Sequence, residues 1–550
     1  MSVLLIPALA LSAAAAETAA IFAPDVLRKH VEVLASDEYE GRAPGTPGEE
    51  KTVEYLVSEF ERYGLEPGNP DGTYVQRVPL VGLTAKSKTD FRAGEQSFSP
   101  ESGTEIVLAS RRFRPKVLLH HSELIFVGYG VEAPEHKWDD YKGEDLSGKT
   151  LLMLINDPAI PDPKDPSKLD PKLFGGKAMT YYGRWTYKYE IASAKNAAAA
   201  LIVHETGPAG YPWEVVGGSF GRENFELDRP EGNDARVAAE GWIHEDAAGK
   251  LLALSGKTLA ELKKAALSKD FRPIHLGIHA SFTIETAMRR VDSKNVVALK
   301  KGADSKLKDE LVVYTAHWDH LGRNPALQGD QIYNGALDNA SGVAGLLGLA
   351  EAAGKSEPPK RSILFAAVAA EEKGLLGSRY YAEHPLYPLE KTIAALNLDG
   401  LQPWGRAKDF VAIGLGMTTI DEPLAKIATA RGRLMRGDPE PEKGFFYRSD
   451  QFEFAKKGVP ALFWGPGIEL IGQPEGTGLA KRAAYTANDY HKVSDQIKPD
   501  WDFAGMADDL ELLRELGVEL ANAAKTPVWR PGTEFKAIRE ASLKPAKPKP

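Results

Sequence analysis

Apolar and polar residues follow each other in blocks along this chain, and after residue 290 the blocks predict strands that alternate with helices. The run Leu-Val-Val-Tyr-Thr at 311–315 is apolar and β-branched with no alternating polar position, as in a strand buried on both faces. Comparable runs stand at 295–299, 362–372 and 393–399. Such alternation is typical of the α/β class, in which helices flank both faces of a mainly parallel central sheet.

Two helices are predicted before this region. The first spans residues 24–34, and the second opens at Thr46-Pro47-Gly48-Glu49, which has the form of a capping box with proline at the first helical position. Gly64 ends the second helix. The loop 40–45, Glu-Gly-Arg-Ala-Pro-Gly, is polar and glycine-rich enough to line a site, but we interpret this region mainly as packing helices.

The residue pattern changes between residues 119 and 285. This stretch predicts strands and a helix of its own but contains few residues that could act together as metal ligands. We therefore expect a smaller, β-rich domain at 119–285, inserted into a main domain made of 21–118 and 286–530. The stretch 213–236 is glycine-rich and polar, which predicts a surface excursion. Residues 531–550, ending in Lys-Pro-Ala-Lys-Pro-Lys-Pro, are predicted to be a disordered tail.

Composition narrows the function classes. Apolar residues make up 43% of the chain and charged residues 26%, and the net charge of −9 is spread out without a basic stripe, which argues against nucleic acid as a partner. The chain has no cysteine, so any metal must be held by His, Asp and Glu. The composition does not indicate the oligomeric state.

The N-terminal stretch 1–20 has an apolar core and an alanine-rich exit, as in a cleaved secretory signal peptide. It lacks the Lys or Arg of a usual n-region, and the alternative is an apolar N-terminal helix. A signal peptide predicts a periplasmic or secreted protein. No later run approaches the roughly 18 apolar residues of a membrane span.

Five potential metal ligands follow one pattern, in which an apolar strand or a loop beside the sheet ends in His, Asp or Glu. The five are His317, Asp338, Glu372, Asp399 and His491. A single residue of this kind is more often a helix cap or a surface residue. Five of them around one predicted sheet, however, predict a site at the ends of its strands.

The set has the composition of a site for two divalent ions. One carboxylate can bridge two cations about 3.5 to 4 Å apart, and each cation then needs roughly one histidine and one further carboxylate. His317 with Asp399 and His491 with Glu372 meet that need, with Asp338 as the bridge. Zn²⁺ is the expected metal, although these ligands also accept manganese or cobalt.

Two further acidic residues stand next to this set. Glu371 precedes a ligand without being one, as a general base requires, and the alternative is a solvated acidic pair at a strand exit. Asp319, two residues after His317, is suited to accept the second imidazole N–H of His317 and fix its tautomer, and the alternative is a turn cap. His320 is not needed to complete the set, so we expect it to support the ligands or the fold.

The motifs Ala-His-Trp-Asp-His-Leu-Gly, Asn-Gly-Ala-Leu-Asp-Asn-Ala-Ser-Gly, Ala-Ala-Glu-Glu-Lys-Gly, Leu-Asn-Leu-Asp-Gly and Tyr-His-Lys-Val-Ser-Asp-Gln together resemble the co-catalytic zinc exopeptidases of metallopeptidase family twenty-eight. The resemblance covers about residues 24–115 and 286–525. It implies a zinc exopeptidase fold that binds two metal ions through the five residues above. It also implies that Glu371 is the general base and that Asp319 accepts the second imidazole N–H of His317. The inserted region is similar to a protease-associated domain.

The resemblance also implies a tyrosine that hydrogen-bonds the oxyanion of the reaction. Tyr490, immediately before His491, stands at a matching place, and a phenol OH can stabilise the charge that develops there. Tyr447, in the loop Phe-Phe-Tyr-Arg-Ser-Asp, is the competing candidate.

We expect an aminopeptidase that acts on peptide substrates. Carboxypeptidase-type members hold a substrate carboxylate with arginines, and Arg184 is roughly placed for such a part, although a surface arginine beside an aromatic cluster is the simpler interpretation. A carboxypeptidase or dipeptidase, and a non-catalytic binding protein with a degenerate peptidase fold, are the alternatives. A cyclase or another amide hydrolase ranks last, because reduced metal sites accompany it in this family.

Overall fold

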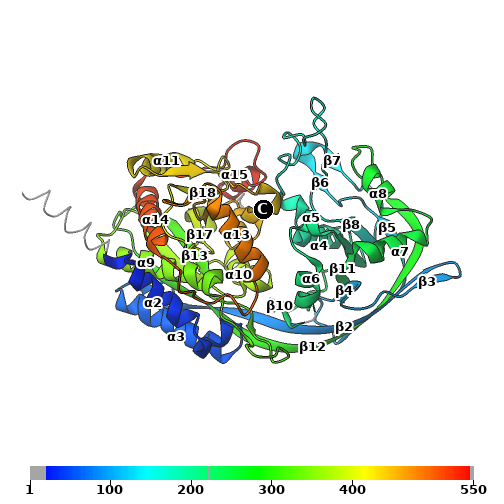
Figure 1. Cartoon of the computed structure of the whole chain (residues 1–550), viewed down its shortest axis with the longest axis horizontal. Coiled ribbons are helices and arrows are strands. Elements are labelled where there is room, and N and C mark those ends of the chain that lie inside the picture. The colour runs from blue at the N-terminus through cyan, green and yellow to red at the C-terminus, as the bar shows by residue number, and fades with distance from the viewer. Residues whose placement is uncertain (1–19, 221, 545–550) are drawn as a thin grey trace, which may run out of the picture. The chain divides into compact units, whose positions relative to one another are not determined.

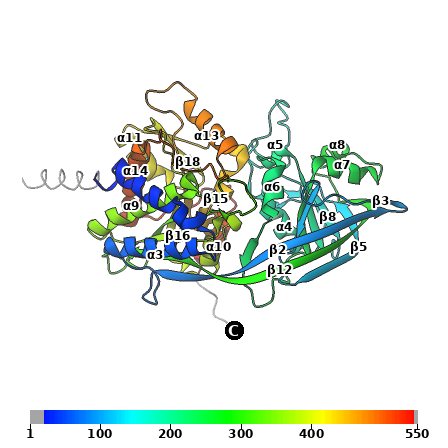
Figure 2. The same ribbon diagram turned by 60° about the horizontal axis from the view of Figure 1, so that its bottom comes forward.

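The computed structural model describes residues 20–220 and 222–544, which form two compact units (Figure 1). The first unit comprises residues 20–78, 292–439 and 448–544, and the second comprises 79–291 and 440–447. Two of the four passages of the chain between the units lie inside paired strands, β2 (Val75–Ala93) and β12 (Ile274–Lys300) (Figure 2), and the other two flank residues 440–447. The predicted signal peptide lies outside the described residues except for Ala20.

A mainly parallel sheet forms the centre of the first unit, in the order β19-β18-β20-β17-β13-β16-β12. Strand β13 pairs in parallel with both β16 and β17, and β17 pairs in parallel with β20, whereas β12 and β18 join antiparallel. The strands are β13 (Leu311–His317), β16 (Ser362–Val368), β17 (Thr392–Leu398), β18 (Asp409–Ile413), β19 (Leu434–Arg436) and β20 (Ala461–Gly465), with the short β1 (Glu66–Pro67) beside β12. The predicted α/β class is confirmed.

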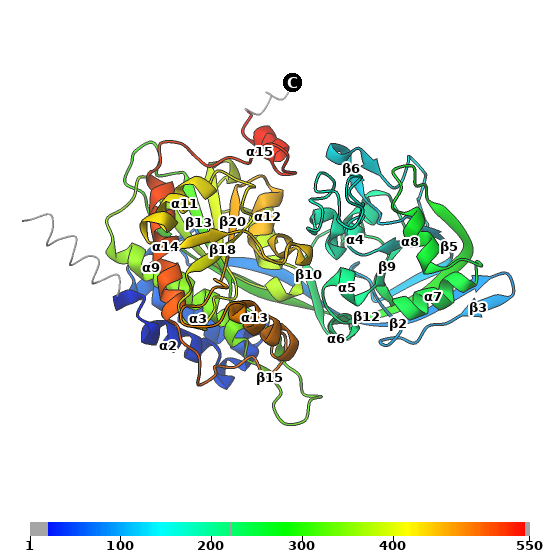
Figure 3. The same cartoon turned by 45° about the horizontal axis from the view of Figure 1, so that its top comes forward.

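Helices cover both faces of this sheet, which is why every residue of β13, β16 and β17 is buried. Helices α9 and α14 pack on one face and α12 on the other (Figure 3). Helices α2 and α3 pack outside α9, and α10 packs against α12. The helices are α2 (Pro24–Leu34), α3 (Pro47–Arg62), α9 (Ser341–Lys355), α10 (Leu376–Glu383), α11 (Asp421–Ala430), α12 (Gln451–Lys456), α13 (Thr477–Asn488) and α14 (Ala504–Asn522).

The second unit is larger than the predicted insertion at 119–285, because β2, β3 (Gln96–Phe98) and β4 also belong to it. Its sheet runs from β12 through β5, β8, β9 and β11 to β4, with helices α4 to α8 around it. Leu152 and Leu154 of β8 enter one apolar core, and Leu151 and Met153 enter another, so the sheet is buried on both faces.

The elements of the second unit have the following bounds: β4 (Ile106–Ala109), β5 (Lys116–Phe126), β8 (Thr150–Leu154), β9 (Ala199–His204), β10 (Asn224–Leu227), β11 (Ala239–His244), α4 (Trp185–Ala194), α5 (Thr206–Ala209), α6 (Trp213–Phe220), α7 (Glu245–Ala253) and α8 (Leu259–Ala265). Helix α6 and strand β10 occupy the stretch that was predicted to be a surface excursion. Strand β10 pairs with β2, and Phe225 and Leu227 on it are buried.

The C-terminal region differs from the predicted disordered tail 531–550. Residues 536–542 form helix α15 (Lys536–Ser542), and Phe535 before it is buried. The Phe535 ring lies 4.8 Å from the ring of Trp529, and Arg539 donates hydrogen bonds to main-chain carbonyls at 389–392. Only residues 545–550 of that predicted tail lie outside the described part of the chain. None of the helices in the described ranges combines the length and the apolar character that crossing a bilayer needs.

Candidate metal centre

Four predicted site residues lie at or just after the carboxyl ends of neighbouring parallel strands. His317 is the last residue of β13, where it pairs with Val368 at the end of β16, and Glu371 and Glu372 follow in a short turn. Asp399 follows β17, which pairs with β13 on its other side. Because parallel strands end at the same edge of a sheet, β13, β16 and β17 bring these side chains together.

Asp338 and His491 reach the same edge from loops. Asp338 lies in the turn Ala336–Ala340 before α9, and its backbone N–H donates a hydrogen bond of 3.1 Å to Asp495. His491 follows α13 and has a φ of 59°, a left-handed conformation that a non-glycine residue rarely adopts. Local structure therefore holds the two loop residues in place.

The two carboxylate oxygens of Asp338 face two different histidines. Oδ1 lies 3.3 Å from Nε2 of His317, and Oδ2 lies 3.3 Å from Nε2 of His491. His317 Nε2 is also 3.4 Å from Asp399 Oδ1, and His491 Nε2 is 3.0 Å from Glu372 Oε2. Asp338 thus stands between two histidine–carboxylate pairs, as a bridging ligand would.

The donor set fits a pair of divalent cations. Two groups of three potential ligands share Asp338, and within each group the ligand atoms lie within 4.8 Å of one another; the groups are His317, Asp338 and Asp399, and His320, Asp338 and Glu372. The Nε2 atoms of His317 and His320 are buried without a hydrogen-bond partner. A buried imidazole nitrogen without a partner is costly unless it binds something, and nitrogen with carboxylate oxygen is a ligand set that zinc prefers.

His320, which we expected to support the ligands or the fold, directly contacts one of the proposed ligands. Its Nδ1 is 2.6 Å from Oε1 of Glu372, while His491 lies near the other oxygen of the same carboxylate. Both histidines therefore contact Glu372, one on each oxygen.

The charges of the site strongly favour bound cations. Burial by itself lowers the pKa of His317, but Glu371 and Asp399 raise it more, so this pKa lies well above its ordinary value. Burial also lowers the pKa of His491, and Glu372 beside it helps to raise that pKa to about 10. Burial raises the pKa of Glu372, but the charge of His491 together with the charge and hydrogen bond of His320 lowers it to about 2. A cluster of ionised carboxylates that binds positive charge is what a metal centre requires.

Glu371 lies beside the ligands without belonging to either group. Its Oε2 is 4.0 Å from Nε2 of His317, and its backbone N–H donates a 3.0 Å hydrogen bond to Oδ1 of Asp319. Burial raises the pKa of Glu371 well above its usual range; His317 lowers it, and the carboxylates of Glu372 and Asp399 raise it further. The left-handed Ala370 ends the extended chain before Glu371, so the rule of alternating side chains no longer applies to the two glutamates.

Asp319 contacts His317 through a different atom from the predicted one. Nδ1 of His317 lies 3.1 Å from the main-chain carbonyl of Asp319 and 3.8 Å from its carboxylate. The carbonyl therefore accepts the second imidazole N–H, and the carboxylate instead holds the backbone of Glu371. Burial raises the pKa of Asp319 to about 7.

Tyr490 stacks on the metal-site histidine. Its ring lies 3.8 Å from the ring of His491 at an interplanar angle of 24°, and 39% of the residue is exposed. Tyr447, the competing candidate, and Arg184 belong to the second unit, and both are buried.

Sequence reasoning missed three residues that hold the ligands. Asp495 accepts hydrogen bonds from the N–H groups of Leu337 and Asp338, and Ser449 donates a 2.7 Å hydrogen bond to Asp399. The buried Arg42, from the loop at 40–45, is the third. The motif containing His491 already held Asp495, and the polar, glycine-rich loop at 40–45 was compatible with a place beside the site, but nothing in the pattern marks Arg42 itself or Ser449 as a site residue.

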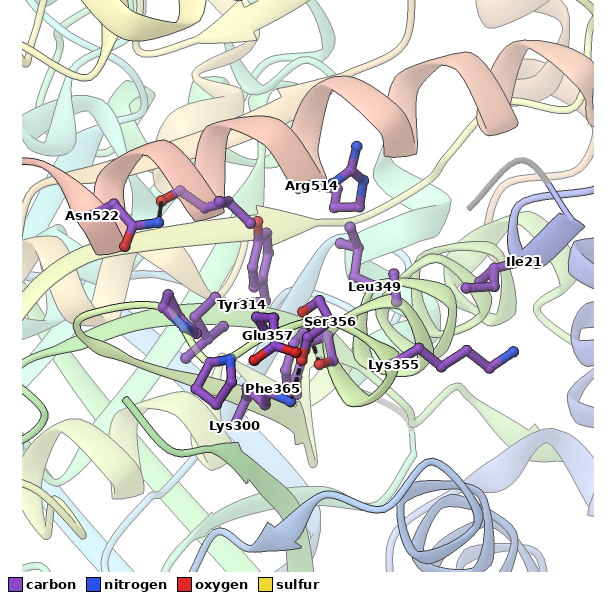
Figure 4. Close-up of a pocket in the computed structure, with 16 residues that line it drawn as sticks. Ile21, Lys300, Tyr314, Leu349, Lys355, Ser356, Glu357, Phe365, Arg514 and Asn522 are labelled. Carbon is purple, nitrogen blue, oxygen red and sulfur yellow. Dashed lines mark hydrogen bonds between the residues drawn. The ribbon is translucent and has the colours of Figure 1, made fainter. Parts of the chain in front are cut away.

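A separate cavity of about 400 Å³ lies in the first unit between α9, α14 and the sheet (Figure 4). Tyr314, Phe365 and Leu349 form part of its apolar wall, and Lys300, Lys355 and Arg514 are among its polar lining residues. Its lining includes none of the predicted ligands, so it is not part of the candidate metal centre.

Comparisons with known proteins show what this chain is similar to. Residues 295–512 match the model of Peptidase family M28, which confirms the resemblance over those residues. Aminopeptidase YwaD of Bacillus subtilis is 35% identical over 156 residues, which cover 28% of each chain. Leucine aminopeptidase 2 of Trichophyton rubrum is 26% identical over 329 residues, covering 56% of this chain and 64% of the relative. The alignments thus span less than two thirds of these curated relatives.

The fold also matches a solved structure, an aminopeptidase from Aneurinibacillus sp. strain AM-1. The TM-score is 0.51 and the sequence identity is 20%, over 93% of this chain and 97% of that chain. At this identity the match concerns the fold alone.

Proposed function

We propose that this chain, whose residues 295–512 form a peptidase family M28 domain, is a metal-dependent aminopeptidase that removes N-terminal residues from peptides. The observation that carries the proposal is the arrangement around Asp338. Each of its oxygens faces a histidine that also lies near a second carboxylate, and Glu371 stands beside this set without joining it.

The proposed cofactor is two zinc ions per chain. His317, Asp338 and Asp399 would hold one ion, and Asp338, Glu372 and His491 the other. When bound, the ions would supply a water of lowered pKa and a positive field for the developing oxyanion.

Glu371 is the proposed general base. Its carboxylate accepts a proton from the attacking water and later returns it to the leaving amine, so that no net proton is gained or lost. Tyr490 is proposed to donate a hydrogen bond from its phenol OH to the oxyanion. Asp319 acts through Glu371, because its carboxylate fixes the backbone N–H of that residue.

The two curated relatives described above favour cleavage at the N-terminal end of the substrate, since both are named aminopeptidases. From the N-terminal stretch we further propose a periplasmic or secreted location. We also propose that the second unit, whose sequence resembles a protease-associated domain, is a domain of that kind.

A panel of free and N-acetylated aminoacyl substrates, assayed with and without a chelator, tests the proposal. An aminopeptidase cleaves the free substrates only, and the chelator abolishes cleavage. Cleavage of the N-acetylated substrates would instead indicate a carboxypeptidase or dipeptidase. A chain that binds fewer than two divalent ions in excess zinc and cleaves nothing would be a binding protein.

A further inference from the structure

Arg42 is a fully buried cation that bonds only to neutral groups in the contacts the structure gives it. The residue is 1% exposed, and its guanidinium donates four hydrogen bonds of 2.5 to 2.9 Å to main-chain carbonyls. The four acceptors are the carbonyls of Leu34, Trp318, Asn334 and Gly335. A planar guanidinium offers five N–H donors in a fixed fork, so four of them are used here.

Three of the four acceptors belong to the two loops that carry metal-site residues, and the fourth, Leu34, ends helix α2. Trp318 lies directly between His317 and Asp319, and its carbonyl accepts from Nε of Arg42. Asn334 and Gly335 precede Asp338 in the second loop and accept from the two terminal nitrogens. One side chain therefore connects the loop of a terminal ligand with the loop of the bridging carboxylate.

The segment that carries Arg42 is held tightly against these loops. Gly41 has a φ of 69°, and a Cβ atom there would lie 2.5 Å from the carbonyl oxygen of Tyr333 and 2.6 Å from that of Gly322. Tyr333 ends β15 (Ile332–Tyr333), and Gly322 opens β14 (Gly322–Arg323), which pairs with it. Only glycine fits at position 41, so Arg42 cannot shift independently of the site.

The side chain of Asn334 adds a second connection. Its amide nitrogen donates to the carbonyl of Ala35 at 2.9 Å and to Oδ1 of Asp37 at 2.8 Å. The loop before Asp338 and the segment before Arg42 are thus hydrogen-bonded in both directions.

The charge of Arg42 complements the acidic ligand set. Burial lowers its pKa to about 10, while Asp495, Asp319, Asp338 and Glu372 favour the charged form, in that order. The guanidinium stays cationic at neutral pH, and its charge reduces the repulsion among the carboxylates of the metal-free site. The same charge repels a bound divalent ion, so the proposed gain in metal affinity comes from the hydrogen bonds to the two loops and not from the charge.

We propose that Arg42 is a positioning residue of the metal centre, which fixes the distance between His317 and Asp338 and so raises the affinity for metal. The inference rests on the proposed metal site. It goes beyond the matched family domain, because residue 42 lies outside 295–512.

Two substitutions of Arg42 separate the effect of its hydrogen bonds from the effect of its positive charge. Arg42→Lys keeps the charge but replaces the planar fork with a single ammonium group, which cannot reach acceptors in both loops. Arg42→Met removes the charge and the hydrogen bonds while keeping most of the apolar stem.

Arg539 offers a matched control in the same unit. It is 8% exposed and donates to the main-chain carbonyls of Leu389, Glu390 and Thr392, at the opposite end of β17 from Asp399. Arg539→Lys therefore removes comparable hydrogen bonds without touching the ligand loops.

The experiment is equilibrium competition for zinc between the full chain and a chromophoric chelator, with thermal melting of the metal-free proteins alongside. We expect Arg42→Lys to weaken zinc binding by about 10- to 100-fold, as loss of contacts behind metal ligands typically does, and Arg42→Met to weaken it further. Arg539→Lys should lower the melting temperature similarly but leave zinc affinity within about twofold of the wild type. Should Arg42→Met fail to fold, Asn334→Ala replaces it and should weaken zinc binding several-fold.

The outcomes distinguish this inference from the proposed function. If the wild type binds two zinc ions and Arg42→Lys binds them equally well, the inference about Arg42 is wrong and the proposed function stands. Equal losses of affinity in Arg42→Lys and Arg539→Lys would also overturn it, because general destabilisation would then be the cause. A wild type that binds no zinc would overturn both.

Discussion

At the scale of single residues, the proposed two-metal site depends most on Asp338, because each of its oxygens faces a different histidine. Replacing it with asparagine removes the charge and leaves one oxygen, which cannot bridge two cations. We expect Asp338→Asn to bind at most one zinc ion and to lose more than about 100-fold in peptidase activity. Elemental analysis of dialysed protein measures the first effect.

The control for this substitution is Asp330→Asn, an exposed aspartate in the connection between β14 and β15. It should bind as much zinc as the wild type. Two zinc ions in Asp338→Asn would show that another residue bridges the metals.

Asp450 provides a pH-dependent prediction in the metal-free protein. It is buried, its Oδ1 accepts a 2.6 Å hydrogen bond from Ser378, and burial raises its pKa from 3.8 to about 7. A carboxyl group whose folded pKa is raised contributes its full stability below pH 4, and that contribution is lost as the pH rises through 7. Asp450→Asn does not titrate and should escape this loss.

Urea unfolding in the presence of a chelator measures the difference. The free energy of unfolding of Asp450→Asn, relative to the wild type, should rise by about 2 to 4 kcal/mol between pH 4 and pH 8. A difference that stays constant over this range would show that Asp450 is not protonated in the folded protein.

The five proposed ligands and Glu371 could be proposed from sequence because each follows a readable strand or lies in a motif. The contacts behind them could not. The hydrogen bond from His317 goes to the carbonyl of Asp319 rather than to its carboxylate. Because every residue has a backbone carbonyl, a residue pattern cannot indicate which carbonyl accepts a hydrogen bond. Arg42 contacts residues nearly 300 positions away, which local patterns cannot reveal.

At the scale of elements, the strands and most helices followed from apolar runs, whereas the ends and caps did not. The predicted capping box at Thr46 is not formed, because Thr46 donates to the carbonyl of Ala43. Glu49 instead accepts hydrogen bonds from Gly45 and Ser293. Both side chains of the predicted box are thus engaged by other partners, two of them local and one, Ser293, far along the chain.

Helix α15 was missed because its anchors are aromatic contacts with distant residues. Phe535 is 2% exposed and packs against the rings of Trp529 and Phe452. We expect Phe535→Ala to lower the free energy of unfolding by about 3 kcal/mol, as large-to-small substitutions of buried aromatics do. Ile538→Ala on α15, where the side chain is 42% exposed, is the control and should change it little.

Denaturant unfolding measures both variants. Equal stability of Phe535→Ala and the wild type would mean that the C-terminal segment is not packed on the first unit in solution.

At the scale of the whole molecule, the sequence indicated two domains, but the boundary moved from residue 119 to 79. The reason is that β2 runs through both units, and a residue pattern cannot show at which residue a continuous strand leaves one unit for the other. The prediction of an insertion depended on the scarcity of potential metal ligands between residues 119 and 285.

All proposed ligands lie in the first unit, so metal should stabilise that unit selectively. Binding to the folded state alone stabilises by about 4 kcal/mol when the free metal exceeds its dissociation constant 1,000-fold. Calorimetry with and without a chelator should therefore show one transition that moves to lower temperature on metal removal and one that stays. A common shift of all transitions would contradict this assignment.

The most direct test of the central claim is the rate at which zinc-loaded Glu371→Gln releases the N-terminal residue of an unblocked peptide. Glutamine keeps the shape of the side chain but cannot accept a proton from water. The account predicts two bound zinc ions, as in the wild type, and a rate lowered by about 10²- to 10⁴-fold. Release at near wild-type rate by the zinc-loaded variant would contradict the proposed mechanism.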